Sequence, residues 1–145
     1  MYKKILVPLD GSELAKKALD HVEPLAKIFN AEIVLFQVVP FIPIYGHMEM
    51  FEPTIIDEKS KQSAERYLTD LADELKKRGF KVTAGVKTGL QVAAEIIDFA
   101  KGKGVDLIVM STHGYSGITL WALGSVARKV LTRAETPILL IHLKR

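Results

Sequence analysis

The stretch LIVMSTHGYSGITLWALGSVARKVL, residues 107–131, passes from an apolar run through a glycine-rich segment into an amphipathic one. Its start predicts a buried strand over Leu107–Ser111, and its end predicts a helix over Ser125–Arg133. The small residues between them allow the backbone to turn tightly or to approach a ligand closely. The rest of the chain has to distinguish these two roles.

The succession of strand and helix recurs along the whole chain. Apolar runs that end in polar or turn residues predict buried strands at Lys4–Leu9, Glu32–Val39, Leu107–Ser111 and Pro137–Leu143. The less apolar, alternating run Phe80–Val86 predicts an edge strand. Amphipathic patterns predict helices over Ser12–Phe29 with a kink at Pro24, Thr54–Arg78, Leu90–Lys101 and Ser125–Arg133. This alternation predicts an α/β fold, an open five-stranded parallel sheet with helices on both faces and right-handed crossovers.

Length and composition predict a single globular domain over residues 1–145. The net charge is +3, but no tract of Lys or Arg stands out, so neither nucleic acid nor a membrane is expected as a partner. The absence of cysteine excludes disulfides and thiol chemistry. The first residues are too short an apolar run for a signal peptide or a membrane span, so we expect a cytoplasmic location.

Open parallel sheets bind ligands beyond the carboxyl ends of their strands. This rule draws attention to three strand exits, at Pro8–Ser12, Val38–Pro40 and the segment that follows Met110. The segment VPFIPIYGHMEMFEP, residues 39–53, is long for a connection in a compact domain. It is expected to be a lid, an interface or a mobile loop.

The glycine-rich segment has the ingredients of an anion site without a common phosphate motif. It lacks the lysine of a P-loop and the GxGxxG of a dinucleotide site. Gly114 and Gly117 could turn backbone N–H groups inward, and Gly124 and Ser125 precede a helix whose N-terminus attracts anions. Alternatively, Ser125 is an ordinary N-cap and the glycines are ordinary turn residues.

Two other polar residues near strand exits have competing interpretations. Asp10 could accept hydrogen bonds from ribose hydroxyls or a base amine, or it could cap the first helix together with Ser12. His113 has no partners at the spacing of a catalytic triad or a metal site, so we expect a turn or ligand-lining role. No catalytic residue is predicted.

Three segments together resemble the universal stress protein family, in its single-domain, ATP-binding form, over the whole chain. These are the start KKILVPLDGS, the end VARKVL followed by TPILLI, and STHG followed by nine residues and Gly124–Ser125. In the ATP-binding branch the motif reads Gly, two residues, Gly, nine residues, Gly, then Ser or Thr. Ser111 stands at the first glycine; if that position needs a left-handed backbone, a Cβ atom there costs about 1–2 kcal/mol.

The resemblance implies a Rossmann-like sheet of strand order 3-2-1-4-5, similar to adenine nucleotide alpha hydrolases. It implies ATP as ligand, with Mg²⁺ or Mn²⁺ held by the phosphates. Pro8 and Asp10 would lie near adenine or ribose, and the backbone of Val38 would read the adenine edge. Ribose and phosphates would meet Ser111, Thr112, His113, Gly114, Tyr115, Ser116, Gly117, Gly124, Ser125, Val126 and Ala127.

The expected function is therefore that of an ATP-binding regulatory or stress protein with slow or no hydrolysis. The alternatives are a dimeric stress protein that binds no nucleotide and an enzyme of a related α/β superfamily. The strand Pro137–Leu143 is almost wholly apolar and, by the family's strand order, lies at a sheet edge. Because an uncovered apolar edge is an aggregation hazard, we expect a homodimer that pairs this strand with its own copy.

Overall fold

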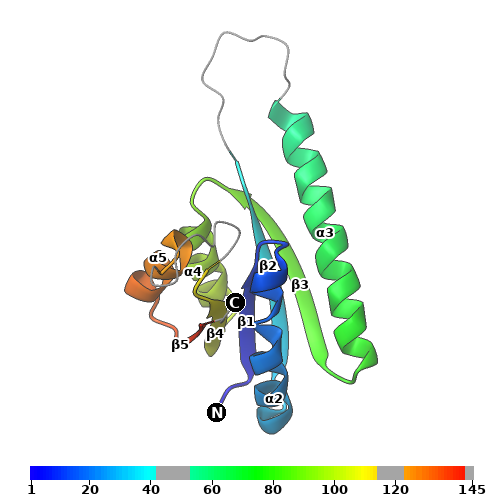
Figure 1. Ribbon diagram of the computed structural model, residues 1–145, viewed down its shortest axis with the longest axis vertical. Helices are drawn as coiled ribbons and strands as arrows, with labels where there is room; N and C mark the ends of the chain where they lie inside the picture. Colours follow the sequence, from blue (N-terminus) through cyan, green and yellow to red (C-terminus); the bar gives the residue numbers. More distant parts are fainter. Residues whose placement is uncertain (42–52, 114–122, 143–145) are drawn as a thin grey trace.

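The computed structural model describes residues 1–41, 53–113 and 123–142, and the statements below concern these residues. Five parallel strands form one sheet in the order β3-β2-β1-β4-β5, which confirms the predicted fold class and strand order (Figure 1). The strands are β1 Lys4–Leu9, β2 Glu32–Pro40, β3 Lys81–Gly89, β4 Leu107–Ser111 and β5 Ile138–Ile141. The order reverses between β1 and β4, which is where sheets of this kind hold ligands.

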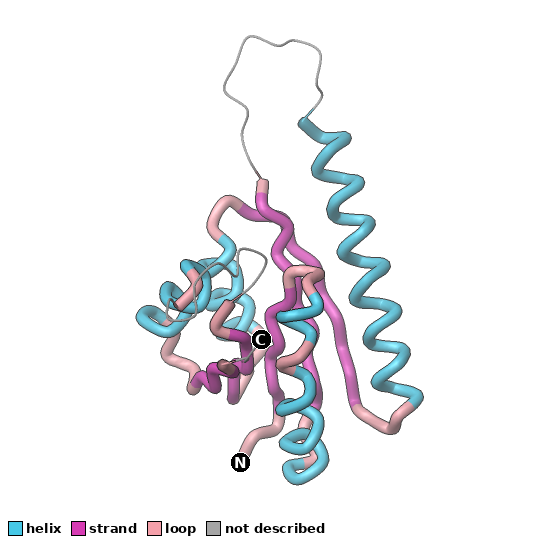
Figure 2. The backbone as a smooth tube through the Cα atoms, in the orientation of Figure 1, coloured by secondary structure: helices cyan, strands magenta, loops and turns pink. Residues whose placement is uncertain are grey.

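The helices cover both faces of the sheet (Figure 2). They are α1 Glu13–Lys16, α2 Leu19–Phe29, α3 Pro53–Lys77, α4 Val92–Gly102 and α5 Ser125–Arg133. One core cluster joins the sheet to the first three helices, and a second joins it to α4 and α5. Alternate residues of a strand enter alternate clusters, as Val7 and Leu6 do in β1. This explains why the central strands read as continuous apolar runs.

The segment expected to form one helix over Ser12–Phe29 forms two helices. The chain turns at Lys17–Ala18, so the prediction of one continuous helix was wrong. Pro24 lies inside α2, and a kink there stays a prediction. The apolar spacing continues across the turn, because Ala15, Ala18 and Leu19 all remain in the core. Asn30 ends α2 in the left-handed conformation, as a C-terminal stop residue does.

Several element boundaries also differ from the sequence-based ones. β3 runs from Lys81 to Gly89 instead of Phe80–Val86, because it pairs with β2 over that whole length. β5 covers Ile138–Ile141 of the predicted Pro137–Leu143, of which Leu143 lies outside the described residues. α3 closes in a Schellman motif, in which Phe80 donates to the Leu75 carbonyl and Gly79 adopts a φ of +90°.

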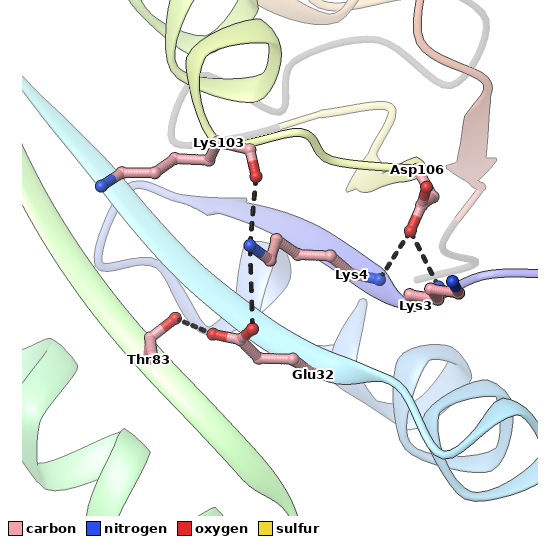
Figure 3. A network of polar contacts seen from close by, with 6 residues as sticks. All are labelled: Lys3, Lys4, Glu32, Thr83, Lys103 and Asp106. Atoms are coloured by element: carbon pink, nitrogen blue, oxygen red, sulfur yellow. Dashed lines mark hydrogen bonds and ion pairs between the residues drawn. The ribbon is translucent and has the colours of Figure 1, made fainter.

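A polar network ties together the amino ends of the strands, opposite the edge where ligands are expected (Figure 3). The Oδ2 atom of Asp106 accepts the backbone N–H groups of Lys3 and Lys4, both at 2.8 Å. The Nζ atom of Lys4 donates to the carbonyl of Lys103 at 3.1 Å. These contacts fix the start of β1 against the turn that leads into β4. Among the described helices, none is long and apolar enough to cross a membrane.

Candidate functional site

A cavity of about 400 Å³ lies at the carboxyl ends of β1, β2 and β4 and at the start of α5. It brings together most of the residues predicted for the site. The predicted residues that line it are Pro8, Asp10, Val38, Ser111, Thr112, Gly124, Ser125, Val126 and Ala127. His113 lies next to these residues in the chain but does not line the cavity, and Gly114, Tyr115, Ser116 and Gly117 lie outside the described residues.

Pro8 explains why the hydrogen-bond ladder between β1 and β4 extends no further along β1. The N–H of Asp106 donates to the Lys4 carbonyl, so the backbone of Lys4, Leu6 and Pro8 faces β4. Pairing with β4 ends at Leu6, which faces Ile108. Because proline has no N–H to donate, the ladder cannot continue through Pro8. Pro8 lies beyond the last paired residue, so the proline breaks no existing hydrogen bond with β4. The hydrogen-bond ladder between the two strands ends at Leu6, and the cavity lies beyond it, at the reversal of strand order.

Asp10 and Ser12 have different roles, because Ser12 caps the first helix and Asp10 lines the cavity. The Oδ1 atom of Asp10 accepts the Ser12 N–H at 2.9 Å and the Ser12 hydroxyl at 2.6 Å. The Ser12 oxygen in turn accepts the Ala15 N–H at 3.1 Å, so Ser12 is the N-cap of α1. Gly11 makes the tight turn between them with a φ of +83°. Asp10 is thereby held at the cavity wall with a fixed orientation.

Ser111 occupies its position without backbone strain. Asn30 is the one non-glycine residue with positive φ in the described chain, so Ser111 does not need the freedom of a glycine. Its side chain is buried, and its hydroxyl donates to the His113 carbonyl at 2.7 Å. The strand exit is therefore held in a turn by a residue that also lines the cavity.

The ring of His113 contacts the strand exit and the ring of His142. Its Nδ1 atom lies 3.0 Å from the Thr112 hydroxyl oxygen, and its ring contacts that of His142 edge-on, at 6.3 Å between centroids. Its Nε2 atom is buried and has no hydrogen-bond partner in the described part of the chain. His113 therefore lies at the strand exit without lining the cavity formed by the described residues.

A close backbone contact explains why a glycine stands at position 124. Its N–H donates to the Thr112 carbonyl at 2.8 Å, and a Cβ atom added to it would lie 2.9 Å from the same oxygen. Its φ is −57°, which any residue can adopt. The glycine is therefore needed for close approach, and the partner that the structure describes is the chain's own strand exit.

The N-terminus of α5 opens onto the cavity without a side-chain cap. Gly124 is the N-cap residue and Ser125 is the first helical residue, so the alternative that Ser125 is an ordinary N-cap is wrong. The first N–H groups of a helix have no intrahelical acceptor, and the helix dipole adds partial positive charge there. The first turn also contains no acidic residue. Such an end attracts anions, whereas Arg128 and Lys129 are exposed on the helix surface.

Sequence reasoning missed the residues that complete the cavity. These are Leu9, Ala15, Gln37, Pro40, Val92, Ile96 and Met110. Val92 and Ile96 are four residues apart on α4 and read as ordinary core positions in the sequence. With Val38 they form an apolar part of the cavity wall, which also includes the anion-attracting start of α5. The arrangement suits a ligand with an apolar ring system at one end and a negative charge at the other.

The comparisons with known proteins agree on one family. The model of the Universal stress protein family matches residues 1–142. Universal stress protein MJ0531 of Methanocaldococcus jannaschii is 35% identical over 141 residues, covering 97% of this chain and 82% of that protein. Universal stress protein MJ0577 of the same organism is 31% identical over 159 residues, covering 99% of this chain and 97% of that protein.

Solved structures agree with this result. The structure of MJ0577 has a TM-score of 0.85 at 30% identity, covering 100% of this chain and 99% of that one. A universal stress protein in complex with cAMP has a TM-score of 0.64 at 22% identity, with 97% of each chain covered, and this second likeness shows the fold alone. The match of the family model over nearly the whole sequence is decisive. The chain belongs to the universal stress protein family.

Proposed function

We propose that this protein binds ATP in the cavity and acts as a regulatory or stress-response protein with slow or no ATP hydrolysis. The observation that carries the proposal is the composition of the cavity wall. An apolar wall of Val38, Val92 and Ile96 and an uncapped helix N-terminus at Ser125 face the same space. A base would lie against the first, and phosphates would lie at the second.

A divalent cation belongs to the same proposal. No group of three or more His, Asp or Glu side chains in the described part of the chain could hold a metal ion alone. We therefore expect Mg²⁺ or Mn²⁺ to enter with the nucleotide, held mainly by phosphate oxygens. The hydroxyls of Ser125 and Thr112 are the neutral oxygens at this end of the cavity that could complete its coordination.

Slow or absent hydrolysis follows from the side chains at the phosphate end. The described residues there offer hydroxyl and backbone groups, from Ser111, Thr112 and Ser125 among others. None of these is a general base, and the lysine of a P-loop is missing from the sequence. Binding without rapid turnover suits a protein that signals through its nucleotide-bound state and not through the products of ATP hydrolysis.

A homodimer through β5 is the second part of the proposal. In the described part of the chain β5 pairs only with β4, on one side. Leu139 of β5 is 37% exposed, and Leu131 of α5 is 47% exposed. Antiparallel pairing of β5 with its copy would satisfy both free strand edges and cover such apolar side chains.

Titration calorimetry of the full chain with ATP and Mg²⁺ tests the nucleotide part. We expect one site per chain, with binding that weakens when Mg²⁺ is removed. Mass spectrometry of nucleotide released from natively purified protein gives an independent readout. The absence of heat and of any thermal shift at millimolar ATP, together with protein purified free of nucleotide, would favour the non-nucleotide alternative.

A further inference from the structure

Gln37 interrupts an otherwise apolar buried strand. β2 reads EIVLFQVVP, and its residues from Ile33 to Val39 are all hydrophobic except Gln37. A polar side chain in such a strand costs stability unless its polar atoms are hydrogen-bonded. The fold alone gives no reason for a glutamine here, because Leu35 and Ile33, two and four residues earlier on the same face, enter the core.

The position of Gln37 is at the cavity. Its Cα pairs with those of Leu9 in β1 and Val86 in β3, so it stands level with the last residue of β1. Gln37 lines the cavity, as Asp10 does. Of the atoms around Gly11, the Nε2 atom of Gln37 is the nearest to where a Cβ would be, at 3.9 Å. Gln37 thus stands beside the turn that carries Asp10.

The amide of Gln37 has unmet hydrogen-bonding capacity. Its Oε1 atom is buried and accepts no hydrogen bond from any described residue. An unsatisfied buried acceptor costs about 1–3 kcal/mol, so native structures rarely keep one without a reason. The terminal torsion of glutamine is broad, which lets the amide turn its edge toward a group that enters the cavity.

The order of the strands places Gln37 at one end of a bound nucleotide. The anion-attracting start of α5 adjoins β4, whereas Gln37 lies on β2, with β1 between them. A ligand with phosphates at Ser125 therefore has its base near β2. The cavity reaches both faces of the sheet there, because Gln37 shares the face of Ile33 and Leu35, whereas Val38 belongs to the other face. The other side chains on the β2 side are apolar, apart from Asp10. Gln37 is the neutral amide that such a base would meet.

We propose that Gln37 selects adenine over other purines, an inference that rests on the proposed nucleotide binding. A glutamine amide can hydrogen-bond adenine at two points, because its oxygen accepts from the 6-amino group and its nitrogen donates to N7. Hypoxanthine and guanine present O6 and N7, two acceptors, on the same edge. Gln37 is thus a specificity-determining residue, and binding of adenine gives its buried oxygen a donor.

The test compares three nucleotides on the full-length wild-type protein by calorimetry with Mg²⁺. These are ATP, 7-deaza-ATP, which lacks N7, and ITP, which has a carbonyl in place of the 6-amino group. We expect ATP to bind at least about five-fold more tightly than either analogue, as expected for a good bidentate pair. Equal affinities for ATP and 7-deaza-ATP would overturn the inference and leave nucleotide binding intact. Failure of all three to bind would instead overturn the proposed function.

Variants assign the selectivity to the side chain. Gln37→Met keeps the length and removes both hydrogen-bonding atoms, so it should bind ATP and 7-deaza-ATP equally. Gln37→Glu keeps an acceptor for the 6-amino group and loses the donor to N7, so it should also lose the preference for ATP over 7-deaza-ATP. Ser125→Ala, at the phosphate end, should weaken ATP and 7-deaza-ATP by the same factor. Selectivity that survives both Gln37 variants would assign adenine recognition to other groups.

Discussion

The backbone N–H of Gly124 donates to the carbonyl of Thr112 at 2.8 Å, which joins the two ends of the segment 113–123 at the cavity wall. Thr112 is anchored on its other side, because its N–H donates to the Ile141 carbonyl of β5 at 3.0 Å. The start of α5 is therefore tied through one residue to the edge of the sheet. The position of the anion-attracting helix end depends on this contact.

Gly124→Ala should displace this junction, because its Cβ would lie 2.9 Å from the Thr112 carbonyl oxygen. Overpacking against backbone predicts a loss of about 1–3 kcal/mol in the free energy of unfolding, measured in urea, and weaker ATP binding. Gly102→Ala in α4 is the matched control, since nothing lies within 4 Å of the added atom. Equal stability of the two variants would contradict the steric account.

Ser111→Gly restores the glycine of the family motif, yet it should not strengthen ATP binding. No left-handed backbone conformation is present at Ser111, so glycine relieves no strain. Both Ser111→Gly and Ser111→Ala remove the hydroxyl that donates to the His113 carbonyl, which predicts a loss of about 0.5–1.5 kcal/mol in the free energy of unfolding. A marked gain in affinity for Ser111→Gly in calorimetry would show that the side chain obstructs the ligand.

Tyr67→Phe should change how stability depends on pH. Burial first, and then the carboxylates of Glu13 and Asp10, raise the pKa of Tyr67 above its ordinary value of 10.0. In the unfolded chain the Tyr67 hydroxyl ionises near pH 10.0. The contribution of the neutral hydroxyl to the free energy of unfolding is therefore complete below that pH and is lost as the pH rises through the higher folded-state pKa. Urea unfolding from pH 8 to pH 11 should show a steeper loss in wild type than in Tyr67→Phe.

The same substitution should have little cost at neutral pH. The Tyr67 hydroxyl is buried and has no hydrogen-bond partner among the described residues, so its removal leaves no described group unsatisfied. A large destabilisation at pH 7 would mean that the hydroxyl has a partner after all. Parallel pH profiles for the two proteins would contradict the raised pKa.

Leu139→Lys should convert the proposed dimer into monomers. Sedimentation equilibrium of wild type at micromolar concentration should give twice the chain mass of 16.1 kDa. Ile28→Lys on α2 is the control, since Ile28 is 74% exposed and lies away from β5. Leu140→Pro should likewise release monomers or unfold the chain. A monomeric wild type, or equal effects of the two lysine variants, would contradict an interface at β5.

ATP turnover should stay below about 1 s⁻¹ in steady state, the lower end of the range typical of enzymes. The reason is that the described side chains at the phosphate end of the cavity, those of Ser111, Thr112 and Ser125, include no general base. The assay follows release of inorganic phosphate at saturating ATP and Mg²⁺. Gly124→Ala serves as the control for contaminating ATPases, because it should bind less nucleotide. Faster turnover in wild type that disappears in Gly124→Ala would show that the protein contains a catalytic residue.

The sequence predicted the strands well because the central ones are buried on both faces. β1 and β4 have the predicted bounds, since the polar residues Asp10 and Thr112 mark their ends. The turn at Lys17–Ala18 was missed because the apolar spacing of a helix continues across it. The spacing of apolar residues predicts which residues are buried. Here it did not predict where the backbone hydrogen bonds of α1 end and those of α2 begin.

The candidate site was predictable where local backbone chemistry defines it. The strand exits at Pro8–Asp10 and Ser111–Thr112 follow apolar runs, and the topology rule brings them together. Gln37 and Ile96 could not be identified in this way, because each reads as part of a regular element. Their role depends on how far the cavity extends beneath α1 and α4, which no local pattern encodes.

Pro8 has a consequence for the kinetics of ligand association. The ladder between β1 and β4 stops at Leu6, and a proline cannot extend it with a further hydrogen bond. Among the described strands, no hydrogen bond between β1 and β4 therefore has to break to admit a ligand at this side of the cavity. Association on this side should then follow a single bimolecular step whose rate rises in proportion to ligand concentration, without the plateau that a slow opening step imposes.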